Sequence, residues 1–149
     1  ADNGTEDRAQ GAELAEQLRD EYSGTRYAQF AALMQARLAV EAGDLASAEG
    51  LLNEIVADAD DPVLEAVARQ RLARVLAAQE RTEEGLEVLG EDASGALLAS
   101  QQEIRGDLLL ALGREDEARS AYQAALAALE DPQARPQLQL KLDDLAEEA

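Results

Sequence analysis

Residues 104–126 read IRGDLLLALGREDEARSAYQAAL, and this stretch decides the fold. It holds two runs of good helix formers separated by Gly113, a residue type that commonly ends a helix. Gly106 and Ala118 place small residues where two helix backbones would meet, and Tyr122 is an aromatic residue at the same interface. The stretch therefore predicts two helices joined by a tight turn, with Tyr122 packed between them.

The same pattern occurs twice upstream. The small residues align as Ala36, Ala73 and Gly106, and the turn positions that follow them as Gly43, Glu80 and Gly113. The repeats are 37 and then 33 residues apart, close to the period of about 34 that is typical of tetratricopeptide repeats. We expect an all-α, tetratricopeptide-type helix-turn-helix solenoid with about three helical pairs, an N-terminal helix and a C-terminal capping helix.

Breaks in the helical pattern place the expected elements. Residues 1–24 form an N-terminal helix with Leu14 and Leu18 on its apolar face, ended by Ser23 and Gly24. Residues 25–149 form the repeat domain, with repeats at about 27–59, 62–92 and 96–130 and a capping helix at 136–148. Within the repeats, the expected helices cover 27–42, 45–57, 63–78, 82–89, 96–112 and 115–129.

Capping residues support these boundaries. Asp44 and Thr82 stand where the second helix of a pair would begin, and both residue types cap helix N-termini. Asp61 followed by Pro62 gives the usual order of an N-cap and a first helical residue.

Composition favours helices and excludes several partners. Aromatic residues make up only 3% of the chain, and no segment alternates apolar β-branched residues with polar ones over a strand length. The 32 Asp and Glu against 13 Lys and Arg leave a net charge of −19. Such a surface repels phosphate backbones and anionic lipid headgroups, so we expect no nucleic-acid partner and no peripheral binding to an acidic membrane.

The residue types that most enzymes and metal sites need are missing. The chain has no Cys and no His, which excludes thiol and imidazole chemistry and the usual zinc ligands. Asp58, Asp60 and Asp61 lack the central glycine and distant glutamate of a calcium loop, so we interpret them as helix caps. Adjacent acids such as Glu83 and Glu84 point about 100° apart on a helix and make a poor acid–base pair. We expect no enzyme, cofactor or metal.

Repeats of this class present binding surfaces instead of catalytic sites. The first helix of each pair should line the inner groove, and Arg74, in the basic string of Arg69, Arg71 and Arg74, directly follows the small residue Ala73. The alternative for Arg74 is a surface salt bridge of little energetic weight. Placing each side chain relative to the aligned small residues predicts a partner-binding groove lined by Phe30, Arg37, Glu41, Gln70, Arg74, Ser100, Glu103 and Asp107.

Several stretches together resemble one family within this class. They are YAQFAALMQARLAVEAGDLASAEGLL (27–52), RLARVLAAQERTEEGLEVL (71–89), the stretch 104–126 and LQLKLDDLA (138–146). The most specific piece surrounds Arg105, Gly106, Ala118, Arg119 and Ser120. In this order they are similar to the YfgM-like family, the ancillary subunits of the SecYEG translocon, from about Thr25 to the C-terminus.

The resemblance implies a non-catalytic, periplasmic interaction domain of a bacterial inner-membrane protein. Its partners would be the SecYEG translocon, a periplasmic prolyl-isomerase-like chaperone and emerging secreted chains. No run in the chain approaches the ~18 apolar residues of a membrane span, so an anchor would lie upstream of Ala1. The alternative is a generic tetratricopeptide adaptor in another envelope complex. An uncleaved upstream span favours the first reading, and a cleavable signal or a lipobox favours the second.

Overall fold

The computed structural model describes residues 3–21 and 26–148. These residues form α-helices and one 3-10 turn, without any strand. In chain order the helices are α1 (Asn3–Glu21), α2 (Arg26–Glu41), α3 (Leu45–Asp58), α4 (Pro62–Ala78), α5 (Thr82–Leu89), α6 (Leu97–Ala111), α7 (Glu115–Ala127) and α8 (Pro136–Glu148), with the 3-10 turn η1 (Pro132–Ala134) before α8. The prediction of an all-α chain is confirmed. Each of these helices was predicted; the ends of α2 to α8 differ from the prediction by at most two residues, and α1 ends three residues before the predicted boundary at residue 24.

The chain divides into two compact units. Residues 1–75 contain α1 to α3 and most of α4, and residues 76–149 contain the end of α4 and α5 to α8. The predicted division into residues 1–24 and 25–149 stays a prediction. The break expected at Ser23 and Gly24 lies outside the described residues.

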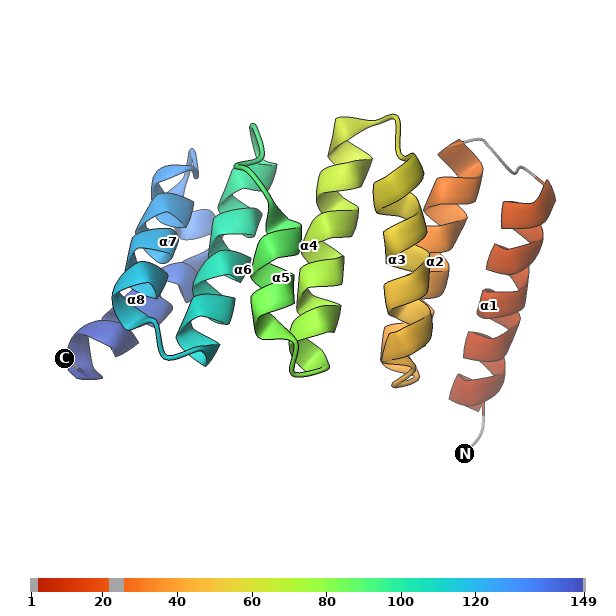
Figure 1. Ribbon diagram of the computed structural model, residues 1–149, viewed down its shortest axis with the longest axis horizontal. Coiled ribbons are helices and arrows are strands. Elements are labelled where there is room, and N and C mark those ends of the chain that lie inside the picture. Colours follow the sequence, from red (N-terminus) through yellow and green to blue (C-terminus); the bar gives the residue numbers. More distant parts are fainter. Residues whose placement is uncertain (1–2, 22–25, 149) are drawn as a thin grey trace. The chain divides into compact units, whose positions relative to one another are not determined.

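In the first unit, α2 contacts both α1 and α3 (Figure 1). Ala36 of α2 and Ala48 of α3 are almost completely buried, and small side chains at these positions let helix backbones approach closely. The guanidinium of Arg19 on α1 donates to Gln35 of α2 (3.1 Å) and to Glu54 of α3 (3.0 Å). Arg19 therefore connects all three helices.

The apolar face predicted for the N-terminal helix was wrong. Leu14 and Leu18 are exposed, whereas Ala15 is fully buried. At Gly11 an added Cβ would lie 3.4 Å from Leu38 of α2, which shows how closely the two helices approach. Small residues form the contact stripe of α1, and its leucines lie outside that stripe.

In the second unit, α6 and α7 pack around the ring of Tyr122, which is buried. A Cβ added at Gly106 of α6 would lie 2.6 Å from Cδ1 of that ring. The predicted roles of Gly106 as the point of closest approach and of Tyr122 as the packing aromatic are confirmed. The core continues through Leu109, Ala118, Ala121, Ala125, Leu138 and Leu145.

The three aligned turn positions share one backbone geometry. Gly43, Glu80 and Gly113 all have positive φ, at 80°, 63° and 75°. Each turn has the two hydrogen bonds of a Schellman motif, which satisfies carbonyl groups at a helix end. The bonds run from Asp44 N to Ala39 O, Gly43 N to Val40 O, Arg81 N to Leu76 O, Glu80 N to Ala77 O, Arg114 N to Leu109 O and Gly113 N to Leu110 O. The alignment of the three turns in the sequence is confirmed.

Two of the three predicted N-caps are present. The carboxylate of Asp44 accepts from Ser47 N (3.2 Å), and that of Asp61 accepts from Val63 N (2.9 Å) ahead of Pro62. Thr82 was predicted to cap α5, but it is the first helical residue, and Arg81 occupies the N-cap without a side-chain cap bond. The guanidinium of Arg81 instead donates to Glu84 in the first turn of α5.

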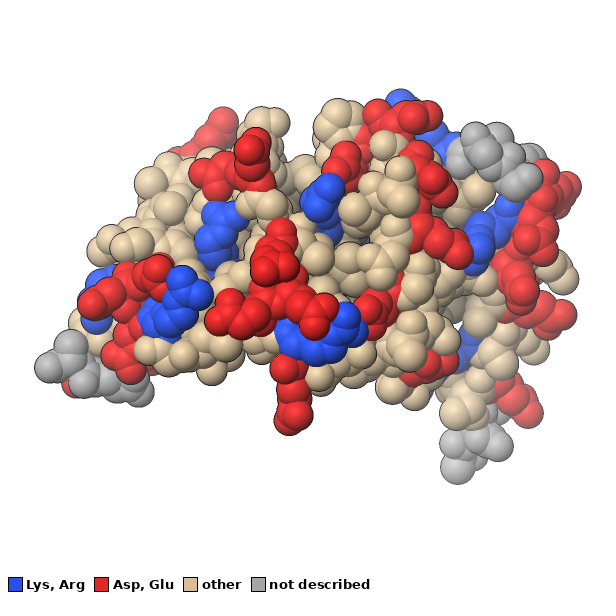
Figure 2. Space-filling view, in the orientation of Figure 1, with Lys and Arg blue, Asp and Glu red and all other residues tan. Residues whose placement is uncertain are grey.

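Carboxylates dominate the surface. Figure 2 shows acidic side chains scattered over the helices of each unit on the face in view. The described helices include none with the length and apolar character that crossing a membrane requires.

We expect Gly106→Ala to destabilise the protein. The new methyl group would overlap a buried ring, and overpacking costs about 1–3 kcal/mol, more than the ~1 kcal/mol that Ala gains over Gly inside a helix. Gly50→Ala on α3 is the matched control, because nothing lies within 4 Å of its added Cβ. Urea unfolding should show a lower free energy of unfolding for Gly106→Ala and a slightly higher one for Gly50→Ala.

We expect Glu80→Gly to stabilise the protein. A non-glycine residue with left-handed backbone angles costs about 1–2 kcal/mol, and the extra chain entropy that glycine loses on folding takes back about 0.5–1 kcal/mol. Glu80→Gly should therefore raise the free energy of unfolding by a net amount of about 0.5–1 kcal/mol, and with it the melting temperature. Gly113→Ala, which makes the reverse change at an equivalent turn, should lower it. An unchanged or lower melting temperature for Glu80→Gly would contradict the strain assigned to Glu80.

Candidate functional site

A groove with an apolar floor lies between α2 and α4 in the first unit. We call it the α2–α4 groove, a cavity of about 380 Å³ lined by Phe30, Leu33, Met34, Arg37, Asp61, Val63, Leu64, Val67 and Arg71. Leu33 and Leu64 are buried and form part of its floor. Phe30, Met34 and Val63 are 58%, 53% and 59% exposed.

Helical spacing brings these side chains together. Phe30 and Met34 are four residues apart on α2, as are Val63 and Val67 on α4, so each pair lies on one face of its helix. A cluster of large apolar side chains that stay exposed beside a cavity is typical of an interaction site. The chain contains one Phe and one Met, and both lie in this groove.

The α2–α4 groove has a positive charge balance in an acidic chain. Arg37 and Arg71 face one carboxylate, Asp61, among its lining residues, which gives a net charge of +1, against −19 for the chain. Arg37 Nε donates to Glu41 Oε1 (3.1 Å), a solvent-exposed pair one helical turn apart. Arg71 is exposed and makes no ion pair with any residue that the structure describes.

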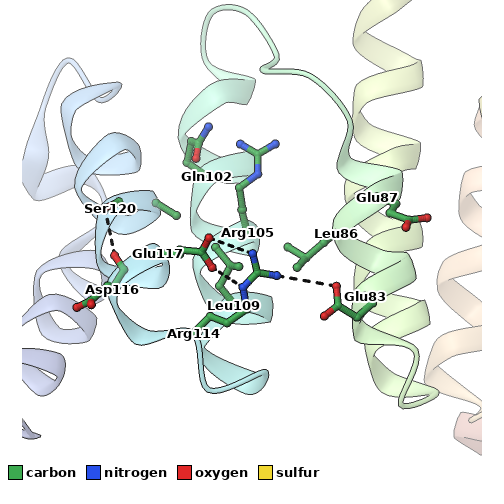
Figure 3. A pocket seen from close by; sticks show the side chains of 11 residues that line it. Glu83, Leu86, Glu87, Gln102, Arg105, Leu109, Arg114, Asp116, Glu117 and Ser120 are labelled. Carbon is green, nitrogen blue, oxygen red and sulfur yellow. Dashed lines mark hydrogen bonds and ion pairs between the residues drawn. The ribbon is translucent and has the colours of Figure 1, made fainter.

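A second groove has the opposite charge balance. It is a cavity of about 680 Å³ in the second unit, bounded by α5, α6 and α7, and we call it the α5–α7 groove (Figure 3). Arg114 pairs with Glu117 of α7 and, at 3.9 Å, with Glu83 of α5. The four carboxylates among its lining residues outnumber the two arginines. Both arginines, Arg105 and Arg114, already pair with carboxylates.

The structure places three of the predicted groove residues together. Phe30 and Arg37 line the α2–α4 groove, and Glu41 pairs with Arg37. Arg74 is exposed on α4 but does not line this cavity, whereas Arg71, one turn earlier, does. Arg71 belongs to the same basic string as Arg74. The contact of these residues with a partner stays a prediction.

The other predicted groove residues face protein atoms. Gln70 and Glu103 are buried, which corrects the expectation that they face an open groove. Ser100 is half-buried, and its hydroxyl donates to Leu97 O (3.0 Å). Asp107 is also half-buried and accepts from the Tyr122 hydroxyl (2.6 Å).

Helix α8 and the turn before it cover Glu103 and Asp107. Lys141 Nζ donates to Glu103 (3.0 Å) and to Asp107 (2.8 Å), and Arg135 donates to the other oxygen of Glu103 (2.7 Å). The ammonium of Lys141 also lies 5.6 Å from the centre of the Tyr122 ring, a cation–π distance. These five residues form a polar cluster that attaches α8 to α6 and α7.

The ionisation of the cluster follows from this geometry. Burial alone would raise the pKa of Glu103, but the hydrogen bonds from Lys141 and Arg135 outweigh it, so the pKa is lowered. Burial alone would lower the pKa of Lys141, and its bonds to Asp107 and Glu103 raise it instead. Burial and the bond to Asp107 raise the pKa of the Tyr122 hydroxyl. These shifts favour an ionised Glu103 and a charged Lys141, paired with each other, and a neutral Tyr122 that donates to Asp107.

The residues that made the family resemblance most specific have structural contacts. Arg105 donates to Gly90 O and to Asp92 (both 2.9 Å), which holds the loop between α5 and α6. Arg119 donates to Leu145 O on α8 (3.3 Å) and to Asp116 (3.0 Å).

Sequence reasoning also missed Gln101. Its side chain accepts from Ala93 N (2.8 Å) and donates to Leu89 O (3.0 Å) and Glu91 O (2.8 Å). No sequence signal distinguishes it from Gln102 beside it.

We expect Glu103→Gln to lower the free energy of unfolding at neutral pH by about 1–3 kcal/mol, because it removes charge-assisted hydrogen bonds. A lowered folded-state pKa gives stability that is present above the ordinary value of 4.5 and is lost as the pH falls through the folded value. As the pH falls below 4.5, the free energy of unfolding of wild type should therefore decrease by more than that of Glu103→Gln. Urea titrations at several pH values test this, with the exposed Glu87→Gln as control. Equal acid sensitivity of wild type and Glu103→Gln would contradict the assignment.

Comparison with known proteins identifies the family. The family model of a tetratricopeptide repeat-like domain matches residues 2–147. No solved structure matches the chain significantly.

Curated relatives carry one common name. Proteins called "Ancillary SecYEG translocon subunit" are 30% identical over 120 residues in Escherichia coli (80% of this chain, 58% of the relative) and 32% over 135 residues in Neisseria gonorrhoeae (90% and 64%). The protein of that name from Aggregatibacter actinomycetemcomitans is 34% identical over 101 residues (68% and 50%). The chain thus spans between half and two thirds of the length of these relatives. It belongs to the tetratricopeptide repeat-like family, and the prediction that it is a YfgM-like protein is confirmed.

Proposed function

We propose that this chain is a non-catalytic protein-interaction domain and that its α2–α4 groove holds a segment of a partner protein. One observation carries the proposal. The only Phe and the only Met of the chain lie exposed in this groove, whereas the cores of both units consist mainly of Ala and Leu. Exposed apolar area is unfavourable in water, and a partner that covers it recovers about 25 cal/mol per Å².

The names of the relatives suggest where this interaction takes place. We propose that the chain is the periplasmic part of an inner-membrane ancillary subunit of the SecYEG translocon, held by an anchor upstream of Ala1. Its partners would be the translocon and a periplasmic prolyl-isomerase-like chaperone, so that secreted chains pass from one to the other. The shared family and the matched length support this role.

The contacts of the polar residues support a non-catalytic role. The polar cluster on α6 is bonded to α8, and Arg114 is bonded between Glu83 and Glu117. In both places ionisable groups are engaged in contacts between helices. A general acid or base would instead need a free path to a substrate.

The test is affinity capture from gently solubilised native membranes, with the full-length protein as bait. We compare wild type with Phe30→Ala combined with Met34→Ala, and use Leu14→Ala on the exposed face of α1 as control. Because these side chains are exposed, the substitutions should change stability little, which circular dichroism checks. Translocon subunits and the chaperone should be recovered with wild type and Leu14→Ala and be depleted with the double variant.

Two other results have clear meanings. Equal recovery with the groove variant would contradict the assignment of the α2–α4 groove. Recovery of neither partner with wild type would contradict the translocon role and favour the generic adaptor. The pair Arg37→Glu and Arg71→Glu, both in the lining of the groove, should also weaken capture without loss of helix content, and loss of the fold would show that these arginines are structural.

A further inference from the structure

We infer that the α2–α4 groove selects a segment from the interior of a partner chain that is both apolar and acidic. In this segment an aromatic or branched aliphatic side chain lies within a few residues of an Asp or a Glu. This inference rests on the proposed function and names the partner chemistry of the same site. It depends on the apolar surface of the groove and on its charge.

The apolar surface fixes one part of the ligand. Met34 of α2 and Val63 of α4 are exposed on the two walls, and Leu33 and Leu64 lie buried beneath. Apolar pockets of this kind bind through hydrophobic contact, with a few polar groups that set orientation. One large apolar side chain from the partner therefore provides the main contact.

The positive charge of the α2–α4 groove determines the second feature of the segment that binds there. Arg37 lies on α2 and Arg71 on α4, so a guanidinium lines each wall of the groove. Arg71 has no ion pair with a described residue, and the partner of Arg37 is an exposed Glu41 one turn away, in a pair of low energy. A carboxylate of the partner can therefore pair with a guanidinium of this groove without displacing a strong ion pair. A lysine of the partner in this groove would be repelled by the positive charges of Arg37 and Arg71.

The α5–α7 groove has the opposite charge arrangement. There, both arginines already pair with carboxylates, Arg105 with Asp92 and Arg114 with Glu117. The surplus of carboxylates would repel an acidic segment. Charge thus directs an acidic segment to the α2–α4 groove.

The acidity of the chain weighs against a membrane as the occupant. A net charge of −19 opposes approach to an anionic bilayer over distances of about a Debye length, roughly 8–10 Å at physiological salt. A second copy carries the same charge and meets the same repulsion. A short segment within a larger partner can reach the two arginines without bringing a large negative surface near.

The test measures binding of short peptides to the 149-residue chain by fluorescence anisotropy. Each peptide carries one Phe flanked by two Glu, two Gln or two Lys in an uncharged background. Acetylated and amidated ends remove the terminal charges. We expect the Glu peptide to bind about fivefold more tightly than the Gln peptide and the Lys peptide to bind weakest, with the difference shrinking as salt rises.

Variants locate the effect. Arg71→Gln should weaken the Glu peptide about two- to fivefold and leave the Gln peptide unchanged. Arg8→Gln on α1 removes an equally exposed positive charge outside the groove and should change neither. Met34→Ala should weaken both peptides, since both use the apolar contact.

The outcomes separate the inference from the function on which it rests. Equal binding of the Glu and Gln peptides, both weakened by Met34→Ala, would overturn the charge selection and leave the groove as an interaction site. Failure of every peptide to bind, together with equal capture by the groove variant, would overturn both. Self-association in sedimentation that Met34→Ala abolishes would assign the groove to a second copy and overturn the inference. Binding to phosphatidylglycerol vesicles that Arg71→Gln abolishes would likewise overturn it in favour of a membrane.

Discussion

The close contact between Gly106 and the Tyr122 ring is the constraint on which the second unit depends. Because Gly106 has no Cβ, the ring can lie against the backbone of α6. That position brings the Tyr122 hydroxyl to Asp107, which also accepts from Lys141. Lys141 in turn bonds to Glu103. One missing methyl group thus permits a chain of contacts that ends in the attachment of α8, and α8 covers the face of α6 that would otherwise be open.

The first unit uses its residues differently. Its helices approach closely through Ala15, Ala36 and Ala48, and aliphatic side chains such as Leu52 and Leu72 fill the rest of its core. Phe30 and Met34 lie outside this core and remain exposed over the α2–α4 groove. The two units therefore differ in what covers a helical surface. In the second, the C-terminal helix α8 covers part of α6, and in the first an apolar, positively charged groove stays exposed.

The sequence predicted the local structure well, because helices and turns depend on neighbouring residues. The glycine-like turn at Glu80 and the packing of Tyr122 followed from spacing alone. The burial of Glu103 could not be predicted, because its partner Lys141 lies 38 residues away and nothing local indicates where α8 packs. The position of Arg71, and not Arg74, beside the cavity could not be predicted for a related reason. Both lie on the same face of α4, and which one meets the cavity depends on how α2 packs beside it.

The most direct test of the central claim is site-specific photo-crosslinking in native membranes, with a photoreactive amino acid in place of Met34 in the full-length protein. The same probe in place of Leu14, equally exposed on α1, is the control. The account predicts crosslinks from position 34 to a translocon subunit or a periplasmic chaperone, and none from position 14. Equal crosslinking from both positions, or from neither, would contradict the claim that the α2–α4 groove holds the partner.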